Sequence, residues 1–109
     1  MATTFKNKNI ATVGTVPVEI LTTTASQRAT IVGLSITNLT TSFVYVTVTI
    51  DDDTSVTGHF MKDVLLPANT SLRAVNGGEK LILAPSNTLK VQSSLSDSVD
   101  VLLSYVEIT

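Results

Sequence analysis

The segment from Ser42 to Ile50 alternates strictly between two kinds of side chain. Val44, Val46 and Val48 share one face of an extended chain with Ile50, whereas the intervening positions carry Phe, Tyr or Thr. Alternation with a period of two residues is typical of a β-strand that has one face in a hydrophobic core. The segment therefore predicts a half-buried strand, around which the rest of the fold has to be built.

Two neighbouring segments are predicted to pair with this strand. Upstream, RATIVGLSIT places Val32, Leu34 and Ile36 on one face, and the five residues that follow, NLTTS, have the right length for a hairpin loop. Downstream, DDDTS is expected to turn the chain into a further strand, VTGHFMKDV. We therefore expect two antiparallel pairings around one central strand.

Short apolar runs separated by turn residues continue along the chain at intervals of roughly ten residues. Pro17 assigns its run to a sheet edge or an irregular start, because proline cannot donate a ladder hydrogen bond. Asn76-Gly77, between SLRAV and EKLIL, predicts a hairpin. Eighteen Thr against three Glu favour strands. We expect one all-β domain over residues 14–109, an antiparallel β-sandwich (jelly-roll-like or Ig-like) of about eight strands, and residues 1–13 as an N-terminal arm or extra edge strand.

Few residues offer catalytic or metal-binding chemistry. His59 is the only histidine, and no nucleophile-elbow motif accompanies it, so we interpret it as an ordinary surface or half-buried residue. Asp51, Asp52 and Asp53 supply the oxygen ligands that Ca²⁺ or Mg²⁺ prefers, but without the calcium-loop spacing. We interpret them as a solvated turn and as weak metal candidates. The sequence predicts no cofactor and no enzymatic activity.

Charge and composition exclude several other classes. A net charge of −2 and seven scattered Lys and Arg residues give no basic patch for nucleic acid. The absence of Cys excludes disulfides and thiolate metal sites. The first residues lack the apolar core of a signal peptide, and no apolar run reaches membrane-spanning length. We therefore expect neither secretion by a signal peptide nor contact with a membrane.

Five residues are candidates for contacts with a partner. Phe43 and Tyr45 lie on the predicted outer face of the central strand, where they would contact either a partner or this domain's own second layer. Phe5 and Ile10 in the N-terminal segment and Tyr105 near the C-terminus complete the set. An extended N-terminal segment is also suited to adding a strand to the edge of a neighbour's sheet.

Several turn-and-strand motifs recur between Ala29 and Ile108: ATIVGLSITNLTTSFVYVTVTI, LPANTSL, NGGEKLIL, LKVQSS and VDVLLSYVEI. In this pattern the chain resembles small virion proteins of tailed bacteriophages, although APSN stands where such proteins commonly carry a Gly-Asp turn. The resemblance implies a β-sandwich made in the host cytoplasm that joins the virion. The expected role is a capsid decoration (cement) protein that binds the head lattice as a homo-oligomer, a trimer if it occupies threefold positions.

The resemblance implies two kinds of partner, namely copies of this chain and the major capsid protein or other phage structural proteins. A neck, tail or fibre component is the alternative within the same class. A carbohydrate-binding β-sandwich module is the alternative from another class. Sugar sites usually need exposed aromatic side chains, and this chain has no Trp and two Tyr.

Overall fold

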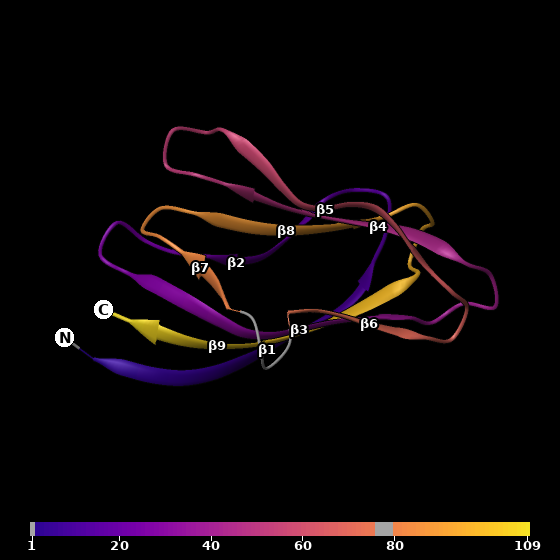
Figure 1. Cartoon of the computed structure of the whole chain (residues 1–109), viewed down its shortest axis with the longest axis horizontal. Coiled ribbons are helices and arrows are strands. Elements are labelled where there is room, and N and C mark those ends of the chain that lie inside the picture. Colours follow the sequence, from indigo (N-terminus) through magenta and orange to yellow (C-terminus); the bar gives the residue numbers. More distant parts are fainter. Residues whose placement is uncertain (1, 76–79) are drawn as a thin grey trace.

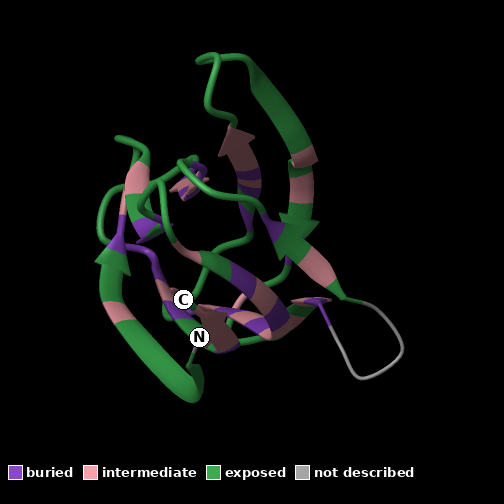
Figure 2. Cartoon of the chain, turned by 90° about the vertical axis from the view of Figure 1, so that its left-hand side faces the viewer, coloured by how far each residue is buried: buried purple, intermediate pink, exposed green. Residues whose placement is uncertain are grey.

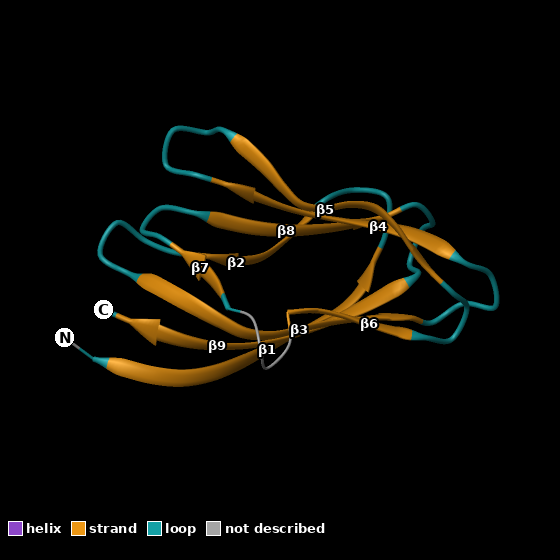
Figure 3. Ribbon diagram, in the orientation of Figure 1, coloured by secondary structure: helices purple, strands orange, loops and turns teal. Residues whose placement is uncertain are grey.

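The computed structural model describes residues 2–75 and 80–109, and every regular element in these ranges is a strand (Figure 3). In residues 2–75 and 80–109 there is therefore no helix that could cross a membrane. The nine strands of the described residues are β1 (Thr3–Val13), β2 (Val18–Thr22), β3 (Arg28–Asn38), β4 (Val44–Asp51), β5 (Thr57–Leu66), β6 (Ser71–Val75), β7 (Leu81–Leu83), β8 (Thr88–Ser93) and β9 (Val99–Ile108). The all-β prediction is confirmed.

The strands form two antiparallel sheets that lie face to face (Figure 1). Sheet A has the order β1-β9-β3-β6, with β7 also paired to β3, and sheet B has the order β2-β8-β4-β5. The chain crosses repeatedly from one sheet to the other, as in a jelly roll, and the order differs from the Ig arrangement. The core between the sheets is mainly aliphatic, and the largest fully buried side chains are Ile20, Ile31, Leu34, Ile36, Leu66, Leu83, Leu89 and Leu103.

The central strand has the predicted orientation, but one of its two predicted partners is wrong. Val44, Val46 and Val48 are fully buried on β4, and Tyr45 is exposed. β5 pairs with β4 across the predicted turn. On its other side β4 pairs with β8, whereas β3 belongs to sheet A. The segment NLTTS therefore crosses between the two sheets and is not a hairpin loop.

Asn38 stabilises the chain where it crosses between the sheets. Its side chain is buried, and its amide nitrogen donates to the carbonyl oxygens of Ser42 (2.9 Å), Leu66 (3.2 Å) and Pro67 (3.1 Å). Its amide oxygen accepts from the backbone N–H (2.9 Å) and the hydroxyl (2.8 Å) of Thr40. One side chain thus joins the β3–β4 crossing to the β5–β6 crossing. It supplies hydrogen-bond partners to backbone carbonyl and N–H groups in these crossings.

The predicted buried face of β3 is correct for two of its three residues. Leu34 and Ile36 are buried, but Val32 is only half-buried and Ile31 is buried in its place. The pairing of β3 with β9 shifts register between Ile31 and Gly33, which is a β-bulge. Because a bulge adds one residue to one strand, the alternation reverses across it.

The prediction of a hairpin between SLRAV and EKLIL is also wrong. β6 pairs with Leu34–Thr37 of β3, and β7 pairs with Ala29–Ile31 on the same side of that strand. Both run antiparallel to β3, so they follow each other in one direction and act as a single interrupted strand. The Asn76-Gly77 turn itself lies outside the described residues.

The N-terminal residues form an edge strand of sheet A. β1 pairs with β9 from Thr3↔Ile108 to Ile10↔Val101, and again at Val13↔Val99 after a bulge. β5 is an edge strand of sheet B. β1 and β5 are both exposed over most of their length (Figure 2). Pro17 directly precedes β2, which is the other edge of sheet B, as its sequence predicts.

Candidate interaction surfaces

The three consecutive aspartates take part in the β4–β5 turn. Asp51 binds the ammonium of Lys90 at 2.9 Å and accepts from the hydroxyl of Thr57 at 2.6 Å. One oxygen of Asp52 accepts from the hydroxyl (2.7 Å) and the backbone N–H (2.9 Å) of Thr54. Among the described residues no group of three acidic or histidine side chains is close enough to hold a metal ion. The turn interpretation accounts for the side-chain contacts of Asp51 and Asp52.

These contacts lower the pKa of both carboxyl groups. For Asp51 the hydrogen bond from Thr57 is the main cause, followed by Lys90, whose own pKa is raised by Asp51. For Asp52 the causes are the hydrogen bonds from Thr54 and from the backbone N–H of Val56. The charged forms therefore stabilise the turn. His59 is exposed on β5, where it pairs across the ladder with Thr49.

The outer face of sheet B carries an exposed cluster that we call the aromatic patch: Phe43, Tyr45 and Leu65. The rings of Phe43 and Tyr45 meet edge to face with centroids 5.6 Å apart. Leu65 of β5 pairs directly with Tyr45 of β4, and residues paired across an antiparallel ladder lie on the same face. All three are exposed, and no second layer formed by the described part of the chain covers them.

The outer face of sheet A presents a surface that we call the sheet A face. Its members alternate with core residues along five strands. They are Phe5, Asn7 and Asn9 of β1; Asp100, Leu102, Ser104 and Val106 of β9; Thr30, Gly33, Ser35 and Thr37 of β3; Ser71 and Arg73 of β6; and Ile82 of β7. Only two members are charged, and most of the others are small. Phe5 (82% exposed), Leu102 (50%) and Ile82 are large apolar residues that face solvent.

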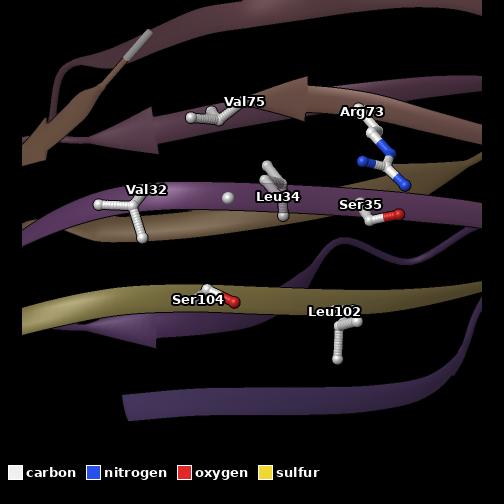
Figure 4. A pocket seen from close by; sticks show the side chains of 8 residues that line it. Val32, Leu34, Ser35, Arg73, Val75, Leu102 and Ser104 are labelled. Carbon is white, nitrogen blue, oxygen red and sulfur yellow. The ribbon is translucent and has the colours of Figure 1, made fainter. Parts of the chain in front are cut away.

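A hollow of about 320 Å³ lies in the middle of the sheet A face, beside Gly33. Figure 4 shows its lining, with Val32 to Ser35 from β3, Leu102 and Ser104 from β9, and Arg73 and Val75 from β6. A second hollow lies on the other side of Leu102, between β9 and β1. Leu102 therefore projects between two depressions. Both are open depressions on the surface and not enclosed cavities, so neither resembles a typical small-molecule site.

The remaining interface candidates lie elsewhere. Tyr105 is 7% exposed and belongs to the core, because it shares the inner face of β9 with Val101 and Leu103. It is therefore not a surface residue of the folded chain. Ile10 is half-buried and packs against the same core. Phe5 is a member of the sheet A face, and the aromatic patch contains Phe43 and Tyr45.

The inner side of β1 carries charge. Lys6 and Lys8 pair with Tyr105 and Leu103, so they share the inner face of the sheet, and Lys6 binds Glu107 at 3.2 Å. Inward-pointing charged residues are a common means of preventing unwanted pairing at a sheet edge. This edge is therefore less suited to strand addition than the N-terminal sequence suggested.

Sequence reasoning missed Gly33, Leu65, Arg73, Asp100 and Leu102. A signal for Leu102 was present: Val101, Leu103 and Tyr105 fix the inner face of their strand, which leaves a large apolar residue pointing outward. Leu65 and Arg73 gave no comparable signal, because their position depends on which strands pair.

No protein-family model and no curated protein sequence matches the chain. Among solved structures, it is similar to a protein of Bacillus endospore appendages, which form disulfide-linked pili. The two chains are 10% identical with a TM-score of 0.60, and the match covers 98% of this chain and 88% of the other. This likeness shows the shared β-sandwich fold. Two structures of infectious bursal disease virus, one of the Gt strain and one of a VP2 subviral particle, match with 9% identity but TM-scores of only 0.40 and 0.32, and the chain covers 30% and 40% of their lengths.

Proposed function

We propose that the chain is a non-enzymatic structural subunit that assembles with copies of itself. The observation that carries the proposal is that large apolar residues face solvent on both outer surfaces of the sandwich. The aromatic patch lies on sheet B, and Phe5, Leu102 and Ile82 lie on sheet A. A module that binds one ligand needs one such surface, whereas a subunit of a shell or filament needs at least two.

The electrostatics of the chain support multi-copy packing. The net charge is −2, and the sheet A face carries a single Arg and a single Asp among its members. Burial of such surfaces between copies costs little desolvation of charge. The pilus protein of the Bacillus appendages supports the proposal as an example of this fold in an assembled fibre. This chain has no Cys, so its own contacts would be non-covalent.

The finer proposal is that the assembly is a bacteriophage virion, with the chain as a decoration protein on the head. It rests on the turn-and-strand motifs between Ala29 and Ile108 and on the neutral, two-sided surface. The partners would then be the major capsid protein and other copies of the chain. Co-sedimentation of the purified chain with undecorated phage heads tests this proposal, and a chain that stays in the supernatant at saturating concentration counts against it.

Sedimentation velocity from about 1 μM to 1 mM tests self-assembly. Two variants block one surface each, Tyr45→Lys in the aromatic patch and Leu102→Lys on the sheet A face. Val56→Lys, at an exposed apolar position in the β4–β5 turn outside both surfaces, is the matched control. We expect the wild type and the control to form species larger than dimers, and each blocked variant to stop at dimers or monomers.

Two outcomes would overturn the proposal. The first is a wild-type chain that stays monomeric throughout this range, because a subunit with two open contact surfaces must associate at high concentration. The second is unchanged assembly of both blocked variants, because the contacts would then lie away from the two surfaces. Glycan binding by a monomer would favour the carbohydrate-binding alternative.

A further inference from the structure

Gly33 has no explanation within the folded monomer. It lies inside β3, the central strand of sheet A, where glycine lowers strand stability. Its φ is not positive, so the backbone does not require glycine, and the bulge beside it is not of the type with a left-handed glycine. A Cβ at this position would meet only Ser104, at 3.7 Å from its Cβ, which is ordinary van der Waals contact. Glycine inside a strand often marks the close approach of another chain.

The hollow beside Gly33 and the neighbouring Leu102 have complementary shapes. The hollow is about 320 Å³ and exists because Gly33, Ser35 and Ser104 present little or no side chain. Leu102 is 50% exposed and projects directly next to it. A surface that carries both a projection and a depression can pack against a second copy of itself, with each copy supplying both parts.

The charges of the sheet A face are complementary in the same way. Arg73 lies two strands away from Asp100, and their ladder partners on β3, Ser35 and Thr37, are two residues apart. With ordinary strand spacing the two side chains start roughly 10 Å apart across the sheet and 7 Å along it. A twofold axis in the plane between two facing copies can therefore set Arg73 of each copy opposite Asp100 of the other. The same axis brings Leu102 over the hollow.

The size of the face allows a weak dimer. Four strands at a spacing of about 4.8 Å and eight residues at about 3.3 Å each give roughly 500 Å² per copy, or about 1,000 Å² in total. This is near the lower limit for a specific interface. A contact of this size is expected to be micromolar by itself and to become strong only when a second surface multiplies it.

We propose that the sheet A faces of two copies pack against each other around a twofold axis, with Leu102 of each copy near the Gly33 hollow of the other and Arg73 paired with Asp100. The inference rests on the proposed self-assembly and specifies its contact. The contact is symmetric, because the sheet A face of one copy packs against the same face of the other. The aromatic patch then provides the separate contact that extends the assembly.

The experiment isolates the sheet A contact by blocking the aromatic patch with Tyr45→Lys. In this background we expect sedimentation equilibrium to show a monomer–dimer equilibrium. Gly33→Leu fills the hollow and is expected to weaken the dimer at least 100-fold. Gly58→Leu is the matched control, because Gly58 also lies in a strand with free space around its Cβ, but on β5 of sheet B. It is expected to leave the equilibrium unchanged.

A charge exchange tests the pairing without altering the hollow. Arg73→Glu is expected to weaken the dimer about 10-fold or more, and adding Asp100→Lys is expected to restore most of the affinity. Because one oxygen of Asp100 also accepts from the backbone N–H of Thr12 at 2.9 Å, the thermal stability of each variant is measured alongside. Rescue of affinity in the double variant cannot arise from a loss of fold.

The outcomes separate this inference from the proposed function. If the wild type assembles but the Tyr45→Lys chain is a monomer or trimer, the symmetric contact is wrong, whereas self-assembly stands. If Gly33→Leu and Arg73→Glu both dimerise like the control, the contact lies elsewhere and the inference is overturned. If the wild type is monomeric at every concentration, both proposals fail. If Gly33→Leu does not fold, the charge exchange decides.

Discussion

Replacement of Asn38 by Ala tests the structural account at its most demanding point. The side chain is 1% exposed and makes five hydrogen bonds, three to backbone carbonyls and two to Thr40. Alanine removes all five and leaves the carbonyl of Leu66, whose hydrogen bond to Asn38 is buried, without this partner. The carbonyl of Ser42 keeps a second donor, the hydroxyl of Thr40.

The size of the effect follows from these contacts. A buried acceptor left without a partner costs about 1–3 kcal/mol, and each partly exposed hydrogen bond contributes about 0.5 kcal/mol once water replaces the partner. Two kcal/mol for the buried acceptor and the smaller losses together give roughly 3–4 kcal/mol. This is a large fraction of the roughly 5–15 kcal/mol by which domains are stable. For a chain of this length 1 kcal/mol corresponds to about 4 °C, so the melting temperature is expected to fall by roughly 14 °C.

Urea denaturation and thermal melts of Asn38→Ala measure this loss, with Asn7→Ala, which is exposed on β1, as the control. Asn38→Asp adds a second test. It keeps the oxygen that faces Thr40 but sets an acceptor against three carbonyl oxygens, which raises the folded-state pKa of the new carboxyl. A raised pKa makes this variant gain stability as the pH falls from 7 towards 4. A loss below about 1 kcal/mol in Asn38→Ala would refute the reasoning.

Three further predictions concern the core, a loop and acid stability. Leu103 is fully buried, and Leu103→Ala is expected to lower the free energy of unfolding by about 2–5 kcal/mol in urea denaturation. Leu102→Ala in a dilute monomer should change it by under about 0.5 kcal/mol. Equal losses would contradict the assigned faces of β9. Thr23→Val removes a buried hydroxyl that donates to Ala84 at 2.7 Å and is expected to cost about 2 kcal/mol; a neutral effect would count against that loop contact. The pKa values of Asp51 and Asp52 are lowered in the folded chain, so their charged forms stabilise the β4–β5 turn fully above the unfolded pKa of 3.8. This contribution is lost as the pH falls through the lower folded pKa values. Asp52→Asn should therefore flatten the fall in melting temperature below pH 4.

The sequence predicts local structure here better than it predicts pairing. The alternation of Val44, Val46 and Val48 is a property of one strand, and the turn at Asp51–Asp53 depends on neighbouring residues, so both predictions hold. The pairing of β3 with β4 is wrong because the connection depends on Asn38, whose three carbonyl partners include two that are almost thirty residues away. A five-residue segment has the same length whether it closes a hairpin or crosses between sheets.

The candidate surfaces show the same limit. Phe43 and Tyr45 follow from alternation alone, and both are exposed. Tyr105 is buried because it shares the inner face of β9 with Val101 and Leu103, and the topology places this strand inside sheet A, between β1 and β3. The sheet A face joins residues from five strands, and glycine at position 33 gains meaning only when its surroundings are known.

The most direct test of self-assembly through two surfaces is an electron cryomicroscopy reconstruction of the assembled chain at side-chain resolution. The account predicts that the sheet A face and the aromatic patch are both buried between copies, with Leu102 of one copy near Gly33 of the next. An assembly held only by the edges of β1 and β5, with both outer faces open to solvent, would contradict it.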